Sequence, residues 1–265
     1  MQFRLFILIS LISILSITGL YAYAVTLDVT ILSEVEDDED TKLLKQPMDA
    51  AVATINGSTY VVVTSYADDG MEIIDISDPE NPISVGRVGD GDDSGRCTVA
   101  NGEKCLEGAN GNAITTINGK TYAIIVATFD DGIEIIDISE PDSPTSVGRL
   151  GDDGIKGCDS TQVCLDAAKE VGIYTRSGST YAVVTATDDD GIEIIDISDP
   201  TSPTSVGSLG DDGIEGGCTA SQVCLDGAKG IAIETINGTP YAIVGATYDD
   251  GIEIIDISDP TNPTS

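Results

Sequence analysis

Clusters of aspartate recur along the chain, and they are the residues whose type and spacing best suit chemistry. Each cluster precedes a glycine, for example at Gly70, Gly132, Gly191 and Gly251. Because dense carboxylate oxygens suit Ca²⁺, one interpretation is a Ca²⁺ site. The candidate ligands are Asp69, Asp131, Asp189, Asp190, Asp250, Asp153 and Asp212. The alternative is turn formation alone, because Asp-Asp-Gly is an ordinary tight-turn sequence and the spacing of an EF-hand loop is missing.

Six cysteines occur as three pairs that are close in sequence. We expect the disulfides Cys97–Cys105, Cys158–Cys164 and Cys218–Cys224. Closing so short a ring stabilises the fold by only about 2 kcal/mol, so the expected role of each bond is to stiffen a loop. The alternative, a thiolate metal site, needs a second pair nearby and a reducing compartment.

Composition excludes several kinds of active site and partner. The chain has no histidine, so it has no Ser-His-Asp triad, no Cys-His pair and no histidine ligand for zinc or haem. It has no tryptophan either, which weakens a sugar-stacking lectin interpretation. With 46 acidic against 12 basic side chains, the formal net charge is −34. Such a surface repels nucleic acid and anionic lipid, so we expect no nucleic-acid partner.

Internal repetition indicates which elements position these residues. The phrase Ile-Ile-Asp-Ile-Ser occurs four times, and its aspartates, Asp75, Asp137, Asp196 and Asp256, lie 62, 59 and 60 residues apart. Each period therefore corresponds to one supersecondary structure. The repeats span about 47–108, 109–167, 168–227 and an incomplete 228–265.

The best-defined repeat reads as a series of antiparallel strands. Residues 230–236 alternate as a first strand, Asn237-Gly238 is a hairpin signal, and residues 241–247 form the second strand. Asp249-Asp250-Gly251 turns the chain into a third strand at 252–257, and residues 204–209 exemplify the fourth. In the second repeat, Ile133 and Ile135 point to one face while Ile136 and Ile138 point to the other. Sheets with two apolar faces must be covered on both sides, which predicts an all-β fold, a β-propeller of tandem four-stranded blades.

The motif of each repeat is familiar. Tyr-Ala-x-x-x-Ala-Thr followed by Asp-Gly-Ile-Glu-Ile-Ile-Asp-Ile-Ser-Asp-Pro resembles the LVIVD repeat of bacterial and archaeal surface propellers, and the best copies are residues 122–148 and 181–207. The resemblance covers most of residues 50–265. It implies a propeller and an exported location, but it brings no general set of catalytic residues. The cysteine-bearing insertions between repeats depart from shorter versions of the motif.

The N-terminus has the features of an export signal. A single positive charge at Arg4 precedes an apolar run, and Ala22-Tyr23-Ala24 matches the small-x-small pattern of a cleavage site. Residues 1–24 are therefore expected to be a signal peptide, and the location extracellular or at the cell surface. The alternative is an uncleaved anchor, the only membrane contact we expect. Residues 25–46 are interpreted as an N-terminal strand and an acidic linker.

The number of blades has two interpretations. The sequence stops at Ser265, where the fourth strand of the fourth repeat should begin, and propellers usually have more than four blades. We therefore expect a C-terminally truncated larger propeller. The alternative is a closed four-blade ring in which residues 25–31 complete the last blade.

Strand order places the aspartate turns and the cysteine loops on one face. Our first hypothesis is a secreted or cell-surface binding or scaffold module, in which this Asp-rich face binds Ca²⁺ or a protein or envelope partner of unknown identity. A second is a structural component of the cell envelope. A third is a carboxylate-dependent hydrolase or lyase. Aspartates repeated in every blade resemble architecture rather than one tuned pair, so no catalytic residue is assigned and no enzyme activity is expected.

Overall fold

The computed structural model describes residues 33–36, 42–89, 106–151, 164–211 and 225–265, whose only regular elements are β-strands. The expected signal at 1–24 and strand at 25–31 lie outside these residues, and the described part of the linker before residue 47 has no strand. No helix in the described ranges is long and apolar enough to cross a membrane.

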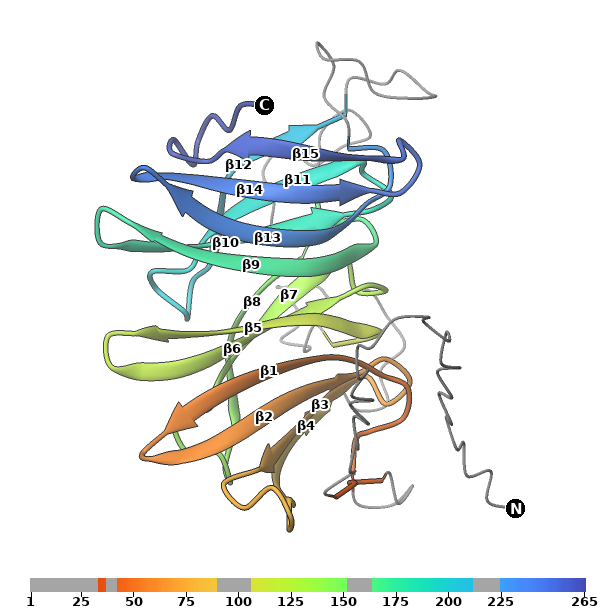
Figure 1. Cartoon of the computed structure of the whole chain (residues 1–265), viewed down its shortest axis with the longest axis vertical. Helices are drawn as coiled ribbons and strands as arrows, with labels where there is room; N and C mark the ends of the chain where they lie inside the picture. Colours follow the sequence, from red (N-terminus) through yellow and green to blue (C-terminus); the bar gives the residue numbers. More distant parts are fainter. Residues whose placement is uncertain (1–32, 37–41, 90–105, 152–163, 212–224) are drawn as a thin grey trace, which may run out of the picture. The chain divides into compact units, whose positions relative to one another are not determined.

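The strands form four antiparallel sheets, one for each repeat, in which consecutive strands are neighbours (Figure 1). This confirms the predicted all-β, bladed fold. The first repeat comprises β1 (Pro47–Ile55), β2 (Ser58–Ser65), β3 (Gly70–Asp75) and β4 (Ile83–Gly89); the second β5 (Ala109–Ile117), β6 (Lys120–Ala127), β7 (Gly132–Asp137) and β8 (Thr145–Gly151); the third β9 (Ala168–Arg176), β10 (Ser179–Ala186), β11 (Gly191–Asp196) and β12 (Thr204–Gly210); the fourth β13 (Ala228–Ile236), β14 (Thr239–Ala246) and β15 (Gly251–Asp256).

Local sequence explains the hairpins between the first two strands of each repeat. Asn56, Asn118 and Asn237, and Ser177 in the third repeat, have φ of 52° to 53°, and the glycine after each is also left-handed. Two positive φ values in succession make the turn whose twist matches a β-hairpin. The first strands begin earlier than predicted: β13 starts at Ala228 rather than Gly230, because a bulge between Ala228 and Ile231 lets Ala228 pair with Ala246.

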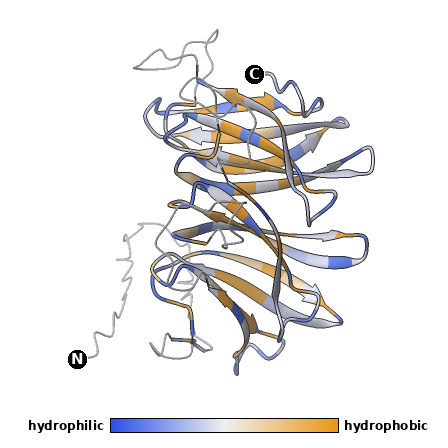
Figure 2. Cartoon of the chain, turned by 180° about the vertical axis from the view of Figure 1, so that it is seen from behind, coloured by the Kyte–Doolittle hydropathy of each residue, from blue (hydrophilic) through white to orange (hydrophobic). Residues whose placement is uncertain are grey.

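Both faces of an internal sheet are buried, as the alternating isoleucines predict. Ile133 and Ile135 pack with residues of the third repeat, whereas Ile136 and Ile138 pack with residues of the first. All four side chains have no exposed surface. Figure 2 shows the corresponding hydrophobic bands along the strands.

The first strands of successive repeats lie next to one another, with β5 between β1 and β9 and β9 between β5 and β13. A glycine in each fourth strand permits a second contact farther out: a β-carbon at Gly86 would clash with the carbonyl of Pro141 in the next repeat, and one at Gly148 would clash with Pro200. The strand-ending Pro turns therefore pack against the preceding repeat.

The described part of the fourth repeat has three strands and one isolated bridge. Asp256 and Thr264 form a two-residue antiparallel bridge. The Ser265 hydroxyl donates to Glu253, as Ser84 donates to Glu72 and Ser146 to Glu134. This serine–glutamate pair marks the same register in each repeat.

Candidate functional site

The first aspartate of each turn binds the backbone of its own repeat, when each repeat is counted from the segment that leads into its first strand. Residues 42–46, 106–108, 164–167 and 225–227 therefore belong to the repeat whose first strand follows them. An Oδ2 atom of Asp68 accepts from the Lys45 amide at 2.8 Å, and that of Asp130 accepts from the Glu107 amide at 2.7 Å. Asp249 accepts from the Asp226 amide at 3.0 Å in the same way. These carboxylates hold the segment before the first strand against the turn between the second and third strands.

The last aspartate of the turn reaches the next repeat in the first three repeats. Oδ1 of Asp69 accepts from the Gly108 amide at 2.8 Å. Oδ1 of Asp131 accepts from the Ala167 amide at 3.0 Å, and Oδ1 of Asp190 from the Gly227 amide at 2.9 Å. We call these three contacts the aspartate bridges. In each, the aspartate is left-handed, with φ between 49° and 51°, a conformation that aspartate tolerates better than most residues.

These bridges assign a structural use to several residues predicted as Ca²⁺ ligands. Asp189 behaves as a first aspartate, because its Oδ2 accepts from the amides of Cys164 and Asp166 at 2.9 Å each, and burial raises its pKa. Asp250 is exposed, with no hydrogen-bond partner in the described part of the chain. Asp153 and Asp212 lie outside the described residues. No group of three or more acidic, histidine or cysteine side chains in the described ranges is placed to hold a metal ion, and Ca²⁺ binding stays a prediction.

Cys164 is the one cysteine among the described residues. Its side chain is buried and disulfide-bonded, and its partner lies outside those residues. The pairings Cys158–Cys164, Cys97–Cys105 and Cys218–Cys224 remain predictions. The amide of Cys164 binds Asp189, so this cysteine lies on the face of the aspartate turns.

All four repeats contribute to one cavity of about 510 Å³ on this same face. We call it the polar basin. The first repeat supplies Tyr66; the second Thr128, Phe129 and Asp131; the third Asp166, Ala167, Lys169, Thr187 and Asp188; the fourth Lys229 and Tyr248. The lining residues therefore include two lysines, three aspartates, two threonines and three aromatic residues.

Two aromatic rings of the basin, those of Phe129 and Tyr248, pack against glycines that have positive φ. A β-carbon at Gly108 would lie 2.8 Å from the Phe129 ring, and one at Gly227 would lie 2.5 Å from the Tyr248 ring. In the third repeat Asp188 replaces the aromatic residue, and Ala167 replaces the glycine. The rings of Tyr66 and Phe129 also touch, with centroids 5.2 Å apart and planes at 55°. Phe129 and Tyr248 are at least half exposed, so their ring surfaces are accessible.

The two lysines lie at equivalent positions near the start of β9 and β13. The Lys169 ammonium donates to the Thr128 hydroxyl at 3.4 Å, and that hydroxyl donates to the Ala168 carbonyl at 2.9 Å. Burial lowers the pKa of Lys169, repulsion from Lys229 lowers it further, and Asp188 raises it. A partly desolvated ammonium beside a carboxylate presents both a donor and an acceptor to a ligand.

Two carboxyl groups lie on the first strands of different repeats, that of Asp49 on β1 and that of Glu170 on β9. Asp49 accepts from the backbone amide of Asn112 at 2.8 Å and from its side-chain amide at 3.1 Å. The pKa of Glu170 is raised to about 7, first by burial and then by the charge of Asp49. Asn112 is 6% exposed, and its Oδ1 has no partner. Two carboxyl groups are thus held in different environments.

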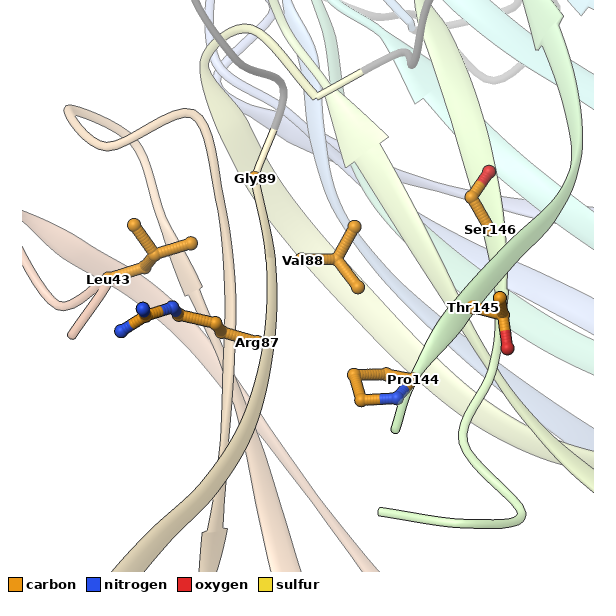
Figure 3. Close-up of a pocket in the computed structure, with 7 residues that line it drawn as sticks. All are labelled: Leu43, Arg87, Val88, Gly89, Pro144, Thr145 and Ser146. Carbon is orange, nitrogen blue, oxygen red and sulfur yellow. The ribbon is translucent and has the colours of Figure 1, made fainter. Parts of the chain in front are cut away.

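A different cavity, of about 580 Å³, lies between the fourth strands of the first and second repeats (Figure 3). Leu43, Arg87 and Val88 line one side, and Pro144, Thr145 and Ser146 line the other. Its lining carries one charged group and comes from two repeats. It is therefore less suited than the polar basin to recognise a ligand with several polar groups.

Sequence reasoning missed the residues that distinguish the basin. Lys169 and Lys229 stand where the first two repeats have Met48 and Asn110, and Phe129 and Tyr248 stand where the other repeats have Ala67 and Asp188. An alignment of the four repeats on Ile-Ile-Asp-Ile-Ser would have shown these exchanges. The aspartates recur more regularly than these lysines and aromatic residues, because they form the contacts within and between repeats.

Solved structures confirm the fold. A putative 6-phosphogluconolactonase from Bacteroides uniformis matches with a TM-score of 0.53 at 15% identity, over 80% of this chain and 54% of its own. An α-L-arabinofuranosidase from Lactobacillus brevis matches with a TM-score of 0.50 at 15% identity, over 84% of this chain and 73% of its own. An exo-β-1,3-galactanase from Phanerochaete chrysosporium has a TM-score of 0.48 at 11% identity, and this chain spans 50% of its length. The confirmation rests on the first two likenesses, and it concerns the fold alone.

The repeat motif gives the family. No curated protein matches the sequence. The model of the LVIVD repeat matches four times, at residues 59–90, 121–152, 180–211 and 240–265. Each match begins in or beside the second strand of one of the four sheets. The chain is therefore an LVIVD repeat protein with a β-propeller-like structure.

Proposed function

We propose that this protein is an exported, non-catalytic binding module whose ligand site is the polar basin. One observation carries the proposal: all four repeats converge on this cavity, and its two lysines and the rings of Phe129 and Tyr248 stand at positions where the repeats differ. Packing between repeats favours the same residue types in every repeat, whereas a single ligand requires different chemical groups around it. The expected location, extracellular or at the cell surface, rests on the N-terminal signal at 1–24.

The lining favours a polyhydroxylated ligand, and we assign the saccharide class. Hydroxyl groups both donate and accept hydrogen bonds, so they can pair with the Lys169 and Lys229 ammonium groups and with the Asp166 and Asp188 carboxylates. The faces of Phe129 and Tyr248 provide the apolar surface on which a sugar ring can stack. The absence of tryptophan weakens a sugar-stacking interpretation, and the rings of Phe129 and Tyr248 support it.

Calorimetric titration with a panel of neutral, amino and uronic oligosaccharides tests this assignment. Lys169→Met and Tyr248→Ala remove one polar and one stacking contact, and each is expected to weaken binding about tenfold, the equivalent of one net hydrogen bond or ring contact. Lys120→Met is the matched control, because Lys120 is exposed and pairs with Asp137 rather than lining the basin. Binding that is absent across the panel, or equally weakened by all three substitutions, would reject the basin.

A second candidate, the carboxylate-dependent hydrolase, is favoured by the Asp49–Glu170 pair. Carboxyl groups whose environments differ are the arrangement from which acid and base roles arise. Activity on aryl glycosides that disappears in Glu170→Gln, while saccharide binding in the basin persists, would support this candidate. Equal rates for the two proteins would reject it.

A further inference from the structure

The first strands of the first three repeats lie next to one another, with β5 between β1 and β9 (Figure 1). Their third residues are Asp49 in β1, Gly111 in β5 and Glu170 in β9. The middle strand therefore has no side chain at the position where both of its neighbours have a carboxyl group. A β-carbon at Gly111 would lie 2.9 Å from Oε2 of Glu170, so this carboxyl group lies over the backbone of Gly111.

The carboxylate of Asp49 reaches the same part of β5 from the strand on its other side. Its Oδ2 accepts from the backbone amide of Asn112 at 2.8 Å and from the side-chain amide of that residue at 3.1 Å. Asn112 directly follows Gly111, so the carboxyl groups from β1 and β9 meet at these two residues. Burial raises the pKa of Glu170 and the charge of Asp49 raises it further, which shows that the two groups are close enough to repel each other.

A threonine on the second strand fixes the backbone of each acidic residue. The Asp49 amide donates to the Thr64 hydroxyl at 3.1 Å, and the Glu170 amide donates to the Thr185 hydroxyl at 3.1 Å. The second repeat, which has glycine in place of the acidic residue, has Val126 in place of the threonine. The acidic residue and its threonine thus occur together in the first and third repeats, where they hold two carboxyl groups in equivalent positions.

Two acceptors at this meeting point have no donor among the residues that the structure describes. A carboxylate only accepts, so the amide nitrogen of Asn112 must face Asp49, and the buried Oδ1 is the atom that has no hydrogen bond. The Asn112 residue is 6% exposed. Within the same ranges, no group donates to the carboxyl of Glu170, and no lysine or arginine forms an ion pair with Asp49 or Glu170. Three oxygen-bearing groups therefore converge without a cation to balance their charge.

We propose that Asp49, Asn112 and Glu170 bind one Ca²⁺ ion through their side-chain oxygens. Ca²⁺ accepts oxygen ligands in flexible arrangements, whereas Mg²⁺ demands a near-ideal octahedron and keeps much of its water. The charge of the ion balances the two carboxylates, and the amide oxygen of Asn112 gains the partner that it lacks. The lining of the polar basin includes none of these three residues, so the site does not depend on the function proposed for the basin. Because its ligands come from β1, β5 and β9, the bound ion joins three successive repeats.

Calorimetric titration of the full, metal-stripped chain with Ca²⁺ at pH 8, above the pKa of Glu170, measures this binding. The wild type is expected to bind with a Kd of about 10⁻⁴–10⁻³ M, the range of extracellular Ca²⁺ modules, and to bind Mg²⁺ about tenfold more weakly. Glu170→Gln and Asp49→Asn each remove one carboxylate, and each is expected to weaken Ca²⁺ binding by about tenfold or more. Glu234→Gln is the matched control, because Glu234 is an exposed residue of another first strand, β13.

Thermal unfolding in chelator and in millimolar Ca²⁺ separates a loss of binding from a loss of folding. In chelator at pH 8, Glu170→Gln is expected to unfold at or above the wild-type midpoint, because burial opposes the charge that the substitution removes. In Ca²⁺ its midpoint is expected to rise less than that of the wild type. A wild-type chain that binds no Ca²⁺ overturns the proposal. Binding that is unchanged in both Glu170→Gln and Asp49→Asn overturns it as well, and assigns the ion to the aspartate turns instead.

Discussion

Replacing Asp69 by alanine tests the aspartate bridge that joins the first two repeats. The substitution removes the acceptor of the Gly108 amide, which costs about 1–3 kcal/mol when the amide has no other partner. It also places alanine at φ near 50°, which adds about 1 kcal/mol. We therefore expect Asp69→Ala to lower the free energy of unfolding by about 2–4 kcal/mol. Asp69→Asn keeps an acceptor and tolerates the left-handed conformation, so its loss is expected to be under about 1 kcal/mol.

Asp250→Ala is the matched control. Asp250 has the same turn sequence and a φ of 52°, but no bridge, so only the backbone cost of about 1 kcal/mol is expected. Urea unfolding of the oxidised protein, in dilute solution where self-association is negligible, compares the three variants with the wild type. Equal losses for Asp69→Ala and Asp250→Ala would refute the bridge. A loss in Asp69→Asn as large as that in Asp69→Ala would show that the negative charge is required, which is the behaviour of a cation ligand.

Three further predictions follow from individual residues. Gly148→Ala is expected to lower the free energy of unfolding by about 1–3 kcal/mol, because the new β-carbon clashes with the Pro200 carbonyl. Gly245→Ala places its β-carbon in open space, so it is expected to be neutral or slightly stabilising in the same urea titration. Because folding raises the pKa of Glu170 from 4.5 to about 7, its contribution to stability is present below pH 4.5 and is lost as the pH rises through 7. Glu170→Gln should therefore be more stable than the wild type above pH 7, by about 1 kcal/mol after discounting solvent screening of this partly buried group. Parallel pH profiles of the two proteins would contradict this. If the aspartate turns bind Ca²⁺, millimolar Ca²⁺ should raise the thermal midpoint above that in chelator or in Mg²⁺ at matched ionic strength, and three equal midpoints would reject cation binding.

The blades could be predicted because each rests on a local or periodic signal. Asn237-Gly238 specifies a hairpin through its backbone preferences, and the alternation of Ile133 to Ile138 requires cover on both faces. The start of β13 was misplaced because the bulge after Ala228 breaks the period of two, and a residue pattern does not reveal which partner strand continues.

The candidate site was less predictable, because it depends on contacts between repeats. The sequence places Asp68 and Asp69 in one turn, but only the fold shows that the first binds its own repeat and the second binds the next. The predicted Ca²⁺ ligands were selected by residue type, which does not distinguish a carboxylate engaged with amides from one available to a cation. Lys169 and Lys229 were overlooked because single exchanges do not disturb the repeat pattern.

The repeats differ at several of the positions that line the basin. The second residue after the second strand lines the basin in three repeats, and the residue that precedes the first strand changes with it. Gly108 accompanies Phe129, Gly227 accompanies Tyr248, and Ala167 accompanies Asp188. A ring needs the glycine because its atoms occupy the space of a β-carbon, whereas a short carboxylate leaves room for the alanine methyl group. The backbone amides of Gly108, Ala167 and Gly227 nevertheless all donate to a bridging aspartate of the preceding repeat. The fold can therefore change the chemistry of the basin one repeat at a time without altering the contacts that join the repeats.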